Sequence, residues 1–169
     1  MTSHGSIDRL AARAVTPDEQ AFAEIAGRAD VTLSLAPGYW HRASVADLEW
    51  QLSRLARLLF AARTKAYHQI RSEDFGEPYT AEPPMIGRRD ESYARARAEL
   101  AVHGEAADGM IRISAVGMQS FTVELDPRVK DMGEDAFCAA VSRAATELVR
   151  AQFAGIMELK RTIYADEPV

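Results

Sequence analysis

Basic residues recur along one predicted helix at a spacing that suits contact with phosphate groups. Because successive helical residues turn by about 100°, five basic side chains of a helix over residues 44–71 fall within an arc of roughly 120°: Arg54, Arg57, Lys65, His68 and Arg71. Such a stripe could neutralise several phosphates, and binding would then weaken steeply as salt rises. The same pattern is typical of an ordinary solvent-exposed helix face. The residues alone leave both interpretations open.

A second basic cluster lies at the start of a shorter helix, predicted over residues 90–102. Four arginines occur there within ten residues: Arg88, Arg89, Arg95 and Arg97. Arginine suits phosphate because its planar guanidinium donates two parallel hydrogen bonds. Three carboxylates are interspersed and could pair with the arginines instead: Asp90, Glu91 and Glu99. A phosphate-binding surface and an internally neutralised helix are both consistent with this pattern.

Catalytic and metal-binding patterns are missing from the sequence. The four histidines have no partner at a recognisable catalytic spacing: His4, His41, His68 and His103. No glycine-rich phosphate loop, nucleophile elbow or HExxH motif occurs. The single cysteine, Cys138, lies in an alanine-rich apolar stretch, which is typical of a small buried hydrophobic residue. We expect a protein that is not an enzyme, with no catalytic residue, no metal site and no cofactor.

Three aromatic residues lie in and just after the loop before the 44–71 helix: Tyr39, Trp40 and Trp50. Aromatic rings of this kind could stack on bases or anchor a protein partner. They could also pack a seam between two parts of the fold, because aromatic side chains bury large areas in small cores. We favour the packing interpretation.

The elements that must position these residues are two long helices, each preceded by a β-hairpin. Ser44 offers a helix N-cap with a carboxylate three residues later, and leucines then recur at three- and four-residue steps to about residue 71. The same apolar periodicity predicts a second helix over residues 134–160. Alternating residues predict hairpins over 18–37 and 108–127, the latter turning at Gly117.

The two halves of the chain match each other at a nearly constant offset. Residues 31–37 align with 121–127 without a gap, and Gly27 then falls on Gly117. When the alignment is shifted by one residue in the next loop, residues 52–54 align with 141–143, which pairs Ser53 with Ser142. Because the order of elements repeats along with the residues, we interpret the chain as two diverged copies of one module.

Acidic, proline-rich sequence separates the two copies. Residues 73–88 lack periodicity and are typical of an extended linker. We therefore expect a first copy over residues 1–72, a linker over 73–88, and a second copy over 89–169. Each copy opens with a short helix, which is weaker at residues 7–14 than at 90–102. The expected fold is α+β, with two tandem helix–β-hairpin–long helix modules that form an intrachain pseudo-dimer.

Short structural motifs in the second half are similar to those of a known family. Residues 107–111, Ala-Asp-Gly-Met-Ile, pass from a short helix into a strand, and residues 123–129, Val-Glu-Leu-Asp-Pro-Arg-Val, leave a hairpin. With the alanine-rich final helix, these motifs make residues 89–160 resemble the YbaB/EbfC family of nucleoid-associated proteins. Residues 16–37 look like a degraded version of the same pattern.

This resemblance implies a helix–hairpin–helix protomer that pairs as a tweezer-shaped homodimer and binds duplex DNA with little sequence preference. A tandem copy would supply both protomers in one chain. The resemblance also implies that the opening helix of the second copy, with its four arginines, contacts DNA.

Composition leaves two functions from different classes open. The 169 residues carry a net charge of −5, which argues against polyanion binding over the whole surface but allows a local basic stripe. The first hypothesis is a nucleoid-associated protein that binds duplex DNA, and the alternative is a protein-interaction module, such as a secretion-system accessory factor, that has lost DNA binding. The single cysteine and the lack of a signal or membrane-spanning pattern predict a cytoplasmic protein without a membrane partner. Under the first hypothesis, the protein would be located at the nucleoid. A homo-oligomer beyond the pseudo-dimer stays open.

Overall fold

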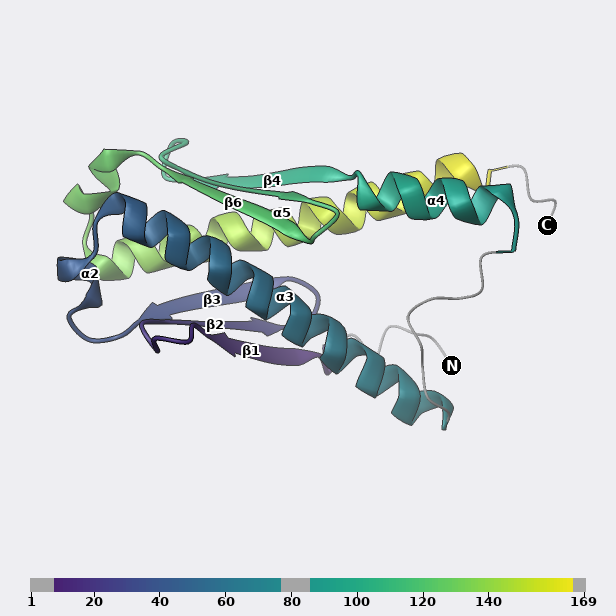
Figure 1. Ribbon diagram of the computed structural model, residues 1–169, viewed down its shortest axis with the longest axis horizontal. Coiled ribbons are helices and arrows are strands. Elements are labelled where there is room, and N and C mark those ends of the chain that lie inside the picture. Colours follow the sequence, from purple (N-terminus) through teal and green to yellow (C-terminus); the bar gives the residue numbers. More distant parts are fainter. Residues whose placement is uncertain (1–7, 77–85, 166–169) are drawn as a thin grey trace.

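The computed structural model describes residues 8–76 and 86–165, which form an α+β fold with two antiparallel sheets and two long helices (Figure 1). The first half contains β1 (Ala11–Val15), β2 (Ala21–Ala26), β3 (Asp30–Leu35), the short helix α2 (Tyr39–Arg42) and α3 (Val45–Phe75). The second half contains α4 (Arg88–Ala98), β4 (Ala101–Ala106), β5 (Ile111–Val116), β6 (Ser120–Leu125), the 3-10 helix η1 (Pro127–Asp131) and α5 (Glu134–Ile163). The α+β class is therefore confirmed.

Each sheet is a three-stranded antiparallel meander. The strand orders are β1-β2-β3 and β4-β5-β6, with Ala23 opposite Leu33 and Ile113 opposite Val123. Burial alternates along β2 and β5, so each sheet turns one face to the core and the other to solvent. The two hairpins predicted from the sequence are thus confirmed, as β2–β3 and β5–β6.

Corresponding turns of the two sheets share their backbone geometry. Gly27 and Gly117 both have a φ of 60°, a left-handed conformation that glycine adopts without steric cost. The Gly27 N–H donates to the carbonyl of Leu10 (2.8 Å), and the Gly117 N–H donates to that of Leu100 (2.9 Å). The predicted alignment of these glycines therefore corresponds to equivalent positions in the two sheets.

The long helices begin and continue as the sequence predicts. At the start of α3, the Asp47 N–H donates to Ser44 Oγ and the Ser44 N–H donates to the Asp47 carboxylate, each at 3.0 Å. These two bonds satisfy backbone donors that the first helical turn leaves open. The helix ends at Gly76, whose φ of 68° stops it. α5 begins at Glu134, as expected, and extends three residues past its predicted end.

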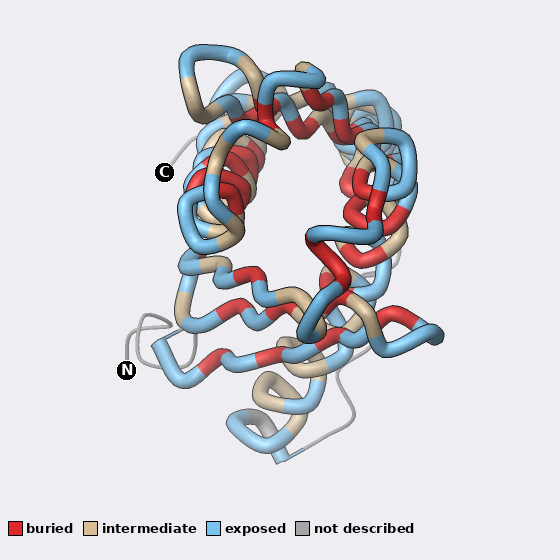
Figure 2. Tube along the Cα trace, turned by 90° about the vertical axis from the view of Figure 1, so that its left-hand side faces the viewer, coloured by how far each residue is buried: buried red, intermediate tan, exposed pale blue. Residues whose placement is uncertain are grey.

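Both long helices pack against both sheets. α3 contacts β1 and β2 of its own half and also β6, while α5 contacts β4 and β5 of its own half and also β3. In the view of Figure 1, the two helices overlap at one end of the molecule and diverge towards the other. Viewed along the long axis, buried residues lie on their inward sides (Figure 2). The buried apolar residues form one continuous core that includes both halves.

The expectation of a helix–hairpin–helix module is wrong in one respect, because each half contains a third strand. Residues 11–15 form β1 rather than part of a helix, and the helix predicted over 90–102 ends at Ala98, before β4. Alanine favours helices in isolation, but Ala12 and Ala14 are buried at the sheet face covered by α3. Pairing with the neighbouring strand and burial against the helix therefore override the local preference.

The linker was expected to begin at residue 73, but α3 continues through residues 73–75. Residues 77–85 of the predicted linker lie outside the described residues. The helix α4 already begins at Arg88, the last residue assigned to the linker. The assignment of residues 1–72 and 89–169 as two copies stays a prediction.

Candidate functional site

A surface groove of about 540 Å³ lies between α3 and the turn that joins β5 to β6. The turn supplies Met118 and Gln119. Helix α3 supplies the rest of the lining: Arg57, Phe60, Ala61, Thr64, Lys65 and His68. Three of the predicted stripe residues, Arg57, Lys65 and His68, therefore lie together in one concave surface.

Helical periodicity explains why these three side chains share the groove. Lys65 is eight residues after Arg57 and His68 is three residues further, so all three lie on one helix face. The opposite face carries the buried leucines Leu48, Leu52, Leu55 and Leu59. Arg57 and Lys65 are exposed, and within the described residues neither makes an ion pair with a carboxylate. Their charge is thus available at the surface.

The opposite wall of the groove is held in place by apolar contacts. Met118 is 8% exposed and has a positive φ of 53°, an uncommon conformation outside glycine. The ring of Phe121, just after the turn, lies 5.8 Å from the ring of Phe60 on α3. These contacts fix the turn against α3 and leave Gln119 exposed at the groove. The sequence contains no local signal for Met118 or Gln119 at this site, because they join α3 only in the tertiary structure.

Helix α4 meets the same turn at its C-terminal end. A Cβ added at Gly117 would lie 2.5 Å from the Ala98 carbonyl oxygen, which shows how closely the end of α4 approaches the turn. Arg95 and Arg97 lie in the last turn of this helix, and both are exposed. These two residues of the second basic cluster therefore lie at the end of α4 that contacts the turn bordering the groove.

The outer part of α4 is docked on the end of α5. Tyr164 donates a hydrogen bond to Asp90 Oδ1 (2.7 Å), and its ring lies 6.0 Å from that of Tyr93. Asp90 also accepts the N–H of Ile86 (3.0 Å). Asp90, one of the three carboxylates that could have paired with the arginines, therefore accepts hydrogen bonds from other groups. Arg88 and Arg89 are exposed at this end of α4, about 10 Å along the helix from Arg95.

Two members of the predicted stripe lie outside the groove lining. Arg54 is partly buried, with its guanidinium carbon 5.0 Å from the centre of the Trp50 ring. Arg71 is also partly buried, and its Nε is inaccessible to solvent. The stripe is therefore divided: its central residues line the groove, whereas its two ends do not.

The aromatic residues near α2 have two different environments. Trp40 is buried, with its ring 4.6 Å from that of Phe137 on α5 and 4.1 Å from Lys130 Nζ. It packs the first half against the second, so the expected seam is confirmed for Trp40. For Trp50 that expectation is wrong, because the side chain is 59% exposed on α3.

The described residues contain no cluster of three or more His, Cys, Asp or Glu side chains that could hold a metal ion. None of the helices among the described residues is long and apolar enough to cross a membrane. No protein-family model matches the sequence, and no curated protein matches it significantly.

Proposed function

We propose that this protein binds the phosphate backbone of duplex DNA with little sequence preference. The contact surface, called the cationic surface below, comprises Arg57 and Lys65 in the groove and Arg95 and Arg97 on α4. The observation that carries this proposal is the gathering of exposed cations from two helices around one turn, without carboxylate partners among the described residues.

The chemistry of the groove is suited to phosphate. Arginine and lysine neutralise the phosphate charge, and the Gln119 amide supplies a neutral hydrogen-bond donor beside them. Contacts to phosphate oxygens carry no base information, so the binding would be nearly independent of sequence. Arg88 and Arg89 extend the same charge along α4, and Arg54 extends it along α3.

We also propose that the chain is a tandem duplication whose halves pair as an intrachain pseudo-dimer. In support, the Leu33 N–H donates to Ser142 Oγ (3.0 Å) and the Val123 N–H donates to Ser53 Oγ (3.2 Å). Both the strand residues and the serines are equivalent in the sequence alignment. The diverging helices in Figure 1 suit the tweezer shape that a resemblance to the YbaB/EbfC family implies.

A protein-interaction module is the second candidate function, and the exposed side chain of Trp50 favours it. Tryptophan is enriched among the residues that dominate binding between proteins, and the net charge of −5 disfavours approach to DNA outside the cationic surface. This alternative predicts that a protein partner binds through Trp50 and not through the cationic surface.

Fluorescence anisotropy with labelled duplexes of unrelated sequence tests the DNA proposal. We expect binding at about 50 mM salt that weakens as salt rises, with a slope of log affinity against log salt of about −0.9 for each phosphate contact. Affinity should be nearly the same for all duplexes. An absence of binding at about 50 mM salt would contradict the proposal and leave the protein-interaction module as the better explanation.

A further inference from the structure

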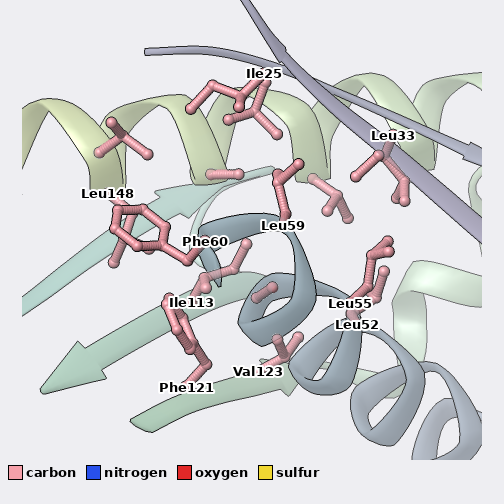
Figure 3. A pocket seen from close by; sticks show the side chains of 16 residues that line it. Ile25, Leu33, Leu52, Leu55, Leu59, Phe60, Ile113, Phe121, Val123 and Leu148 are labelled. Atoms are coloured by element: carbon pink, nitrogen blue, oxygen red, sulfur yellow. The ribbon is translucent and has the colours of Figure 1, made fainter. Parts of the chain in front are cut away.

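The long helices and the two sheets line a partly open apolar cavity of about 60 Å³ (Figure 3). All 16 residues that line it are apolar, and they come from both halves of the chain. Helix α3 supplies Leu52, Ala56 and Leu59 among others, and α5 supplies the equivalent residues Val141, Ala145 and Leu148. Each half thus provides one helical wall.

The size and lining of the cavity restrict what it could hold. One water needs roughly 10–15 Å³ of such space, but a water also needs two to four polar partners, which this apolar lining does not offer. The volume corresponds to a hydrocarbon chain of about four to six carbon atoms. A short aliphatic group therefore suits the cavity better than solvent does.

Polar side chains continue both helical walls by one turn. Arg63 is four residues after Leu59 and seven after Ala56, so it lies on the cavity-lining face of α3. Gln152 has the same relation to Leu148 and Ala145 on α5. The cavity-lining faces of the two helices thus continue into a guanidinium on α3 and an amide on α5, at positions that the sequence alignment pairs.

Arg63 spans the space between the two helices. Its guanidinium carbon lies 5.7 Å from the centre of the Phe60 ring and 5.1 Å from that of Phe153 on α5. One amino group donates to the Arg28 carbonyl oxygen (3.3 Å). The Nε atom is buried without a hydrogen-bond partner, and burial lowers the pKa of this side chain. Within the described residues, no carboxylate neutralises this charge.

Gln152 is the second unsatisfied polar group at this end. The side chain is 8% exposed, and its Oε1 atom is buried without a partner. Buried polar atoms without partners are rare in folded proteins. A half-turn of the amide about its last side-chain bond replaces this oxygen by the NH2 group, which donates hydrogen bonds.

We infer that the cavity and its polar end form a binding site for a short aliphatic carboxylate. The hydrocarbon chain fills the space between the helices, and the carboxylate accepts hydrogen bonds from Arg63 Nε and from the Gln152 amide. Binding supplies the missing counter-charge between the two phenylalanine rings. The site shares Phe60 with the groove but contains no residue of the cationic surface, and it does not depend on DNA binding.

Isothermal titration calorimetry with sodium hexanoate tests this inference. We expect saturable binding of one hexanoate per chain, with a Kd of about 1 mM or below. Sodium acetate, which lacks the chain, and 1-hexanol, which lacks the charge, should each bind at least about tenfold more weakly. Arg63→Gln should weaken hexanoate binding by about tenfold or more, whereas the same change at exposed Arg143 on α5 should leave it unaffected.

Filling the cavity provides an independent test of the hydrocarbon site. Ala145→Leu, or Ala56→Leu on the opposite wall, should abolish hexanoate binding. In the wild-type protein, hexanoate should shift the methyl resonances of Ile113 and Val123, which line the cavity. Absence of hexanoate binding, methyl shifts confined to other residues, or equal affinity for hexanoate and acetate would each overturn the inference.

Discussion

Ser53 on α3 and Ser142 on α5 make the same pair of hydrogen bonds in opposite halves of the protein. Each hydroxyl donates to the carbonyl four residues earlier in its own helix, Glu49 for Ser53 and Cys138 for Ser142, at 2.7 Å. Each also accepts an N–H from the edge strand of the other half, Val123 in one case and Leu33 in the other. The two serines therefore satisfy edge-strand donors that would otherwise lack a partner in the sheet.

Replacing either serine by alanine should destabilise the protein by a similar amount. Ser53→Ala removes the acceptor of the Val123 N–H, and Ser142→Ala removes that of the Leu33 N–H; we expect a loss of about 1–2 kcal/mol for each. Urea unfolding followed by circular dichroism measures this cost. Ser34→Ala, at an exposed position on β3, is the control and should change stability by less than about 0.5 kcal/mol. Clearly unequal costs for the two serines would contradict their equivalence.

Because the described residues form one core across both halves, the chain should unfold in one transition without needing a second chain. An obligate dimer loses stability on dilution, whereas an intrachain pseudo-dimer does not. Thermal unfolding across the micromolar range should give a constant Tm. A Tm that falls with dilution, or two separate transitions, would contradict the pseudo-dimer.

Gly104 should be intolerant of a side chain. A Cβ at this position would lie 1.9 Å from the Ala144 carbonyl oxygen and 2.7 Å from the Leu148 nitrogen, so Gly104→Ala forces β4 away from α5. We expect a loss of about 3 kcal/mol in the free energy of unfolding. Gly133→Ala, with no atom within 4 Å of the added Cβ, should cost no more than about 1 kcal/mol. Similar costs at the two glycines would contradict the close packing of β4 on α5.

Cys138 should react slowly with thiol reagents while the protein is folded. Burial, followed by the charges of Glu134 and Asp135, raises its pKa to about 11. Since only the thiolate reacts and a free cysteine has a pKa of about 8.5, the folded protein at pH 8 should react roughly a hundredfold more slowly than an unstructured thiol. The rate should rise with pH until the thiol ionises near pH 11. If Cys138 is labelled rapidly at pH 8 even under conditions that stabilise the folded protein, the result would contradict this expectation.

If the cationic surface binds DNA, replacing its basic residues should weaken DNA affinity. Replacing Arg57 and Lys65 by alanine, or Arg95 and Arg97 by alanine, should weaken binding equally for unrelated duplexes. Each lost phosphate contact should make the slope of log affinity against log salt shallower by about 0.9. Alanine at Arg88 and Arg89 tests whether the contact extends along α4.

The matched control for these variants removes the same amount of charge elsewhere. Arg13 and Arg150 are exposed, and each lies beside a carboxylate, Glu24 and Asp30 respectively. Their double alanine variant should leave DNA affinity nearly unchanged. If this control weakens binding as much as the surface variants do, the net charge rather than the cationic surface governs the interaction.

The sequence by itself determined the elements whose signals are local. The capping pair Ser44 and Asp47 marks the start of α3, and leucine periodicity marks its course, because both depend on residues three or four positions apart. Alternation and a glycine turn likewise mark the two hairpins. The predicted alignment of the two halves also pairs Ser53 with Ser142, which accept corresponding strand N–H groups.

Only the tertiary structure decided which of those elements form sites. Alanines at residues 11–15 lack a strong local preference for a strand, and pairing with β2 places them in the sheet. The groove unites Lys65 with Gln119, more than fifty residues apart, and the space beside Arg63 is closed by Phe153 from the other half. Periodicity places a side chain on a helix face, but the partner of that face depends on packing between segments that are distant in the chain.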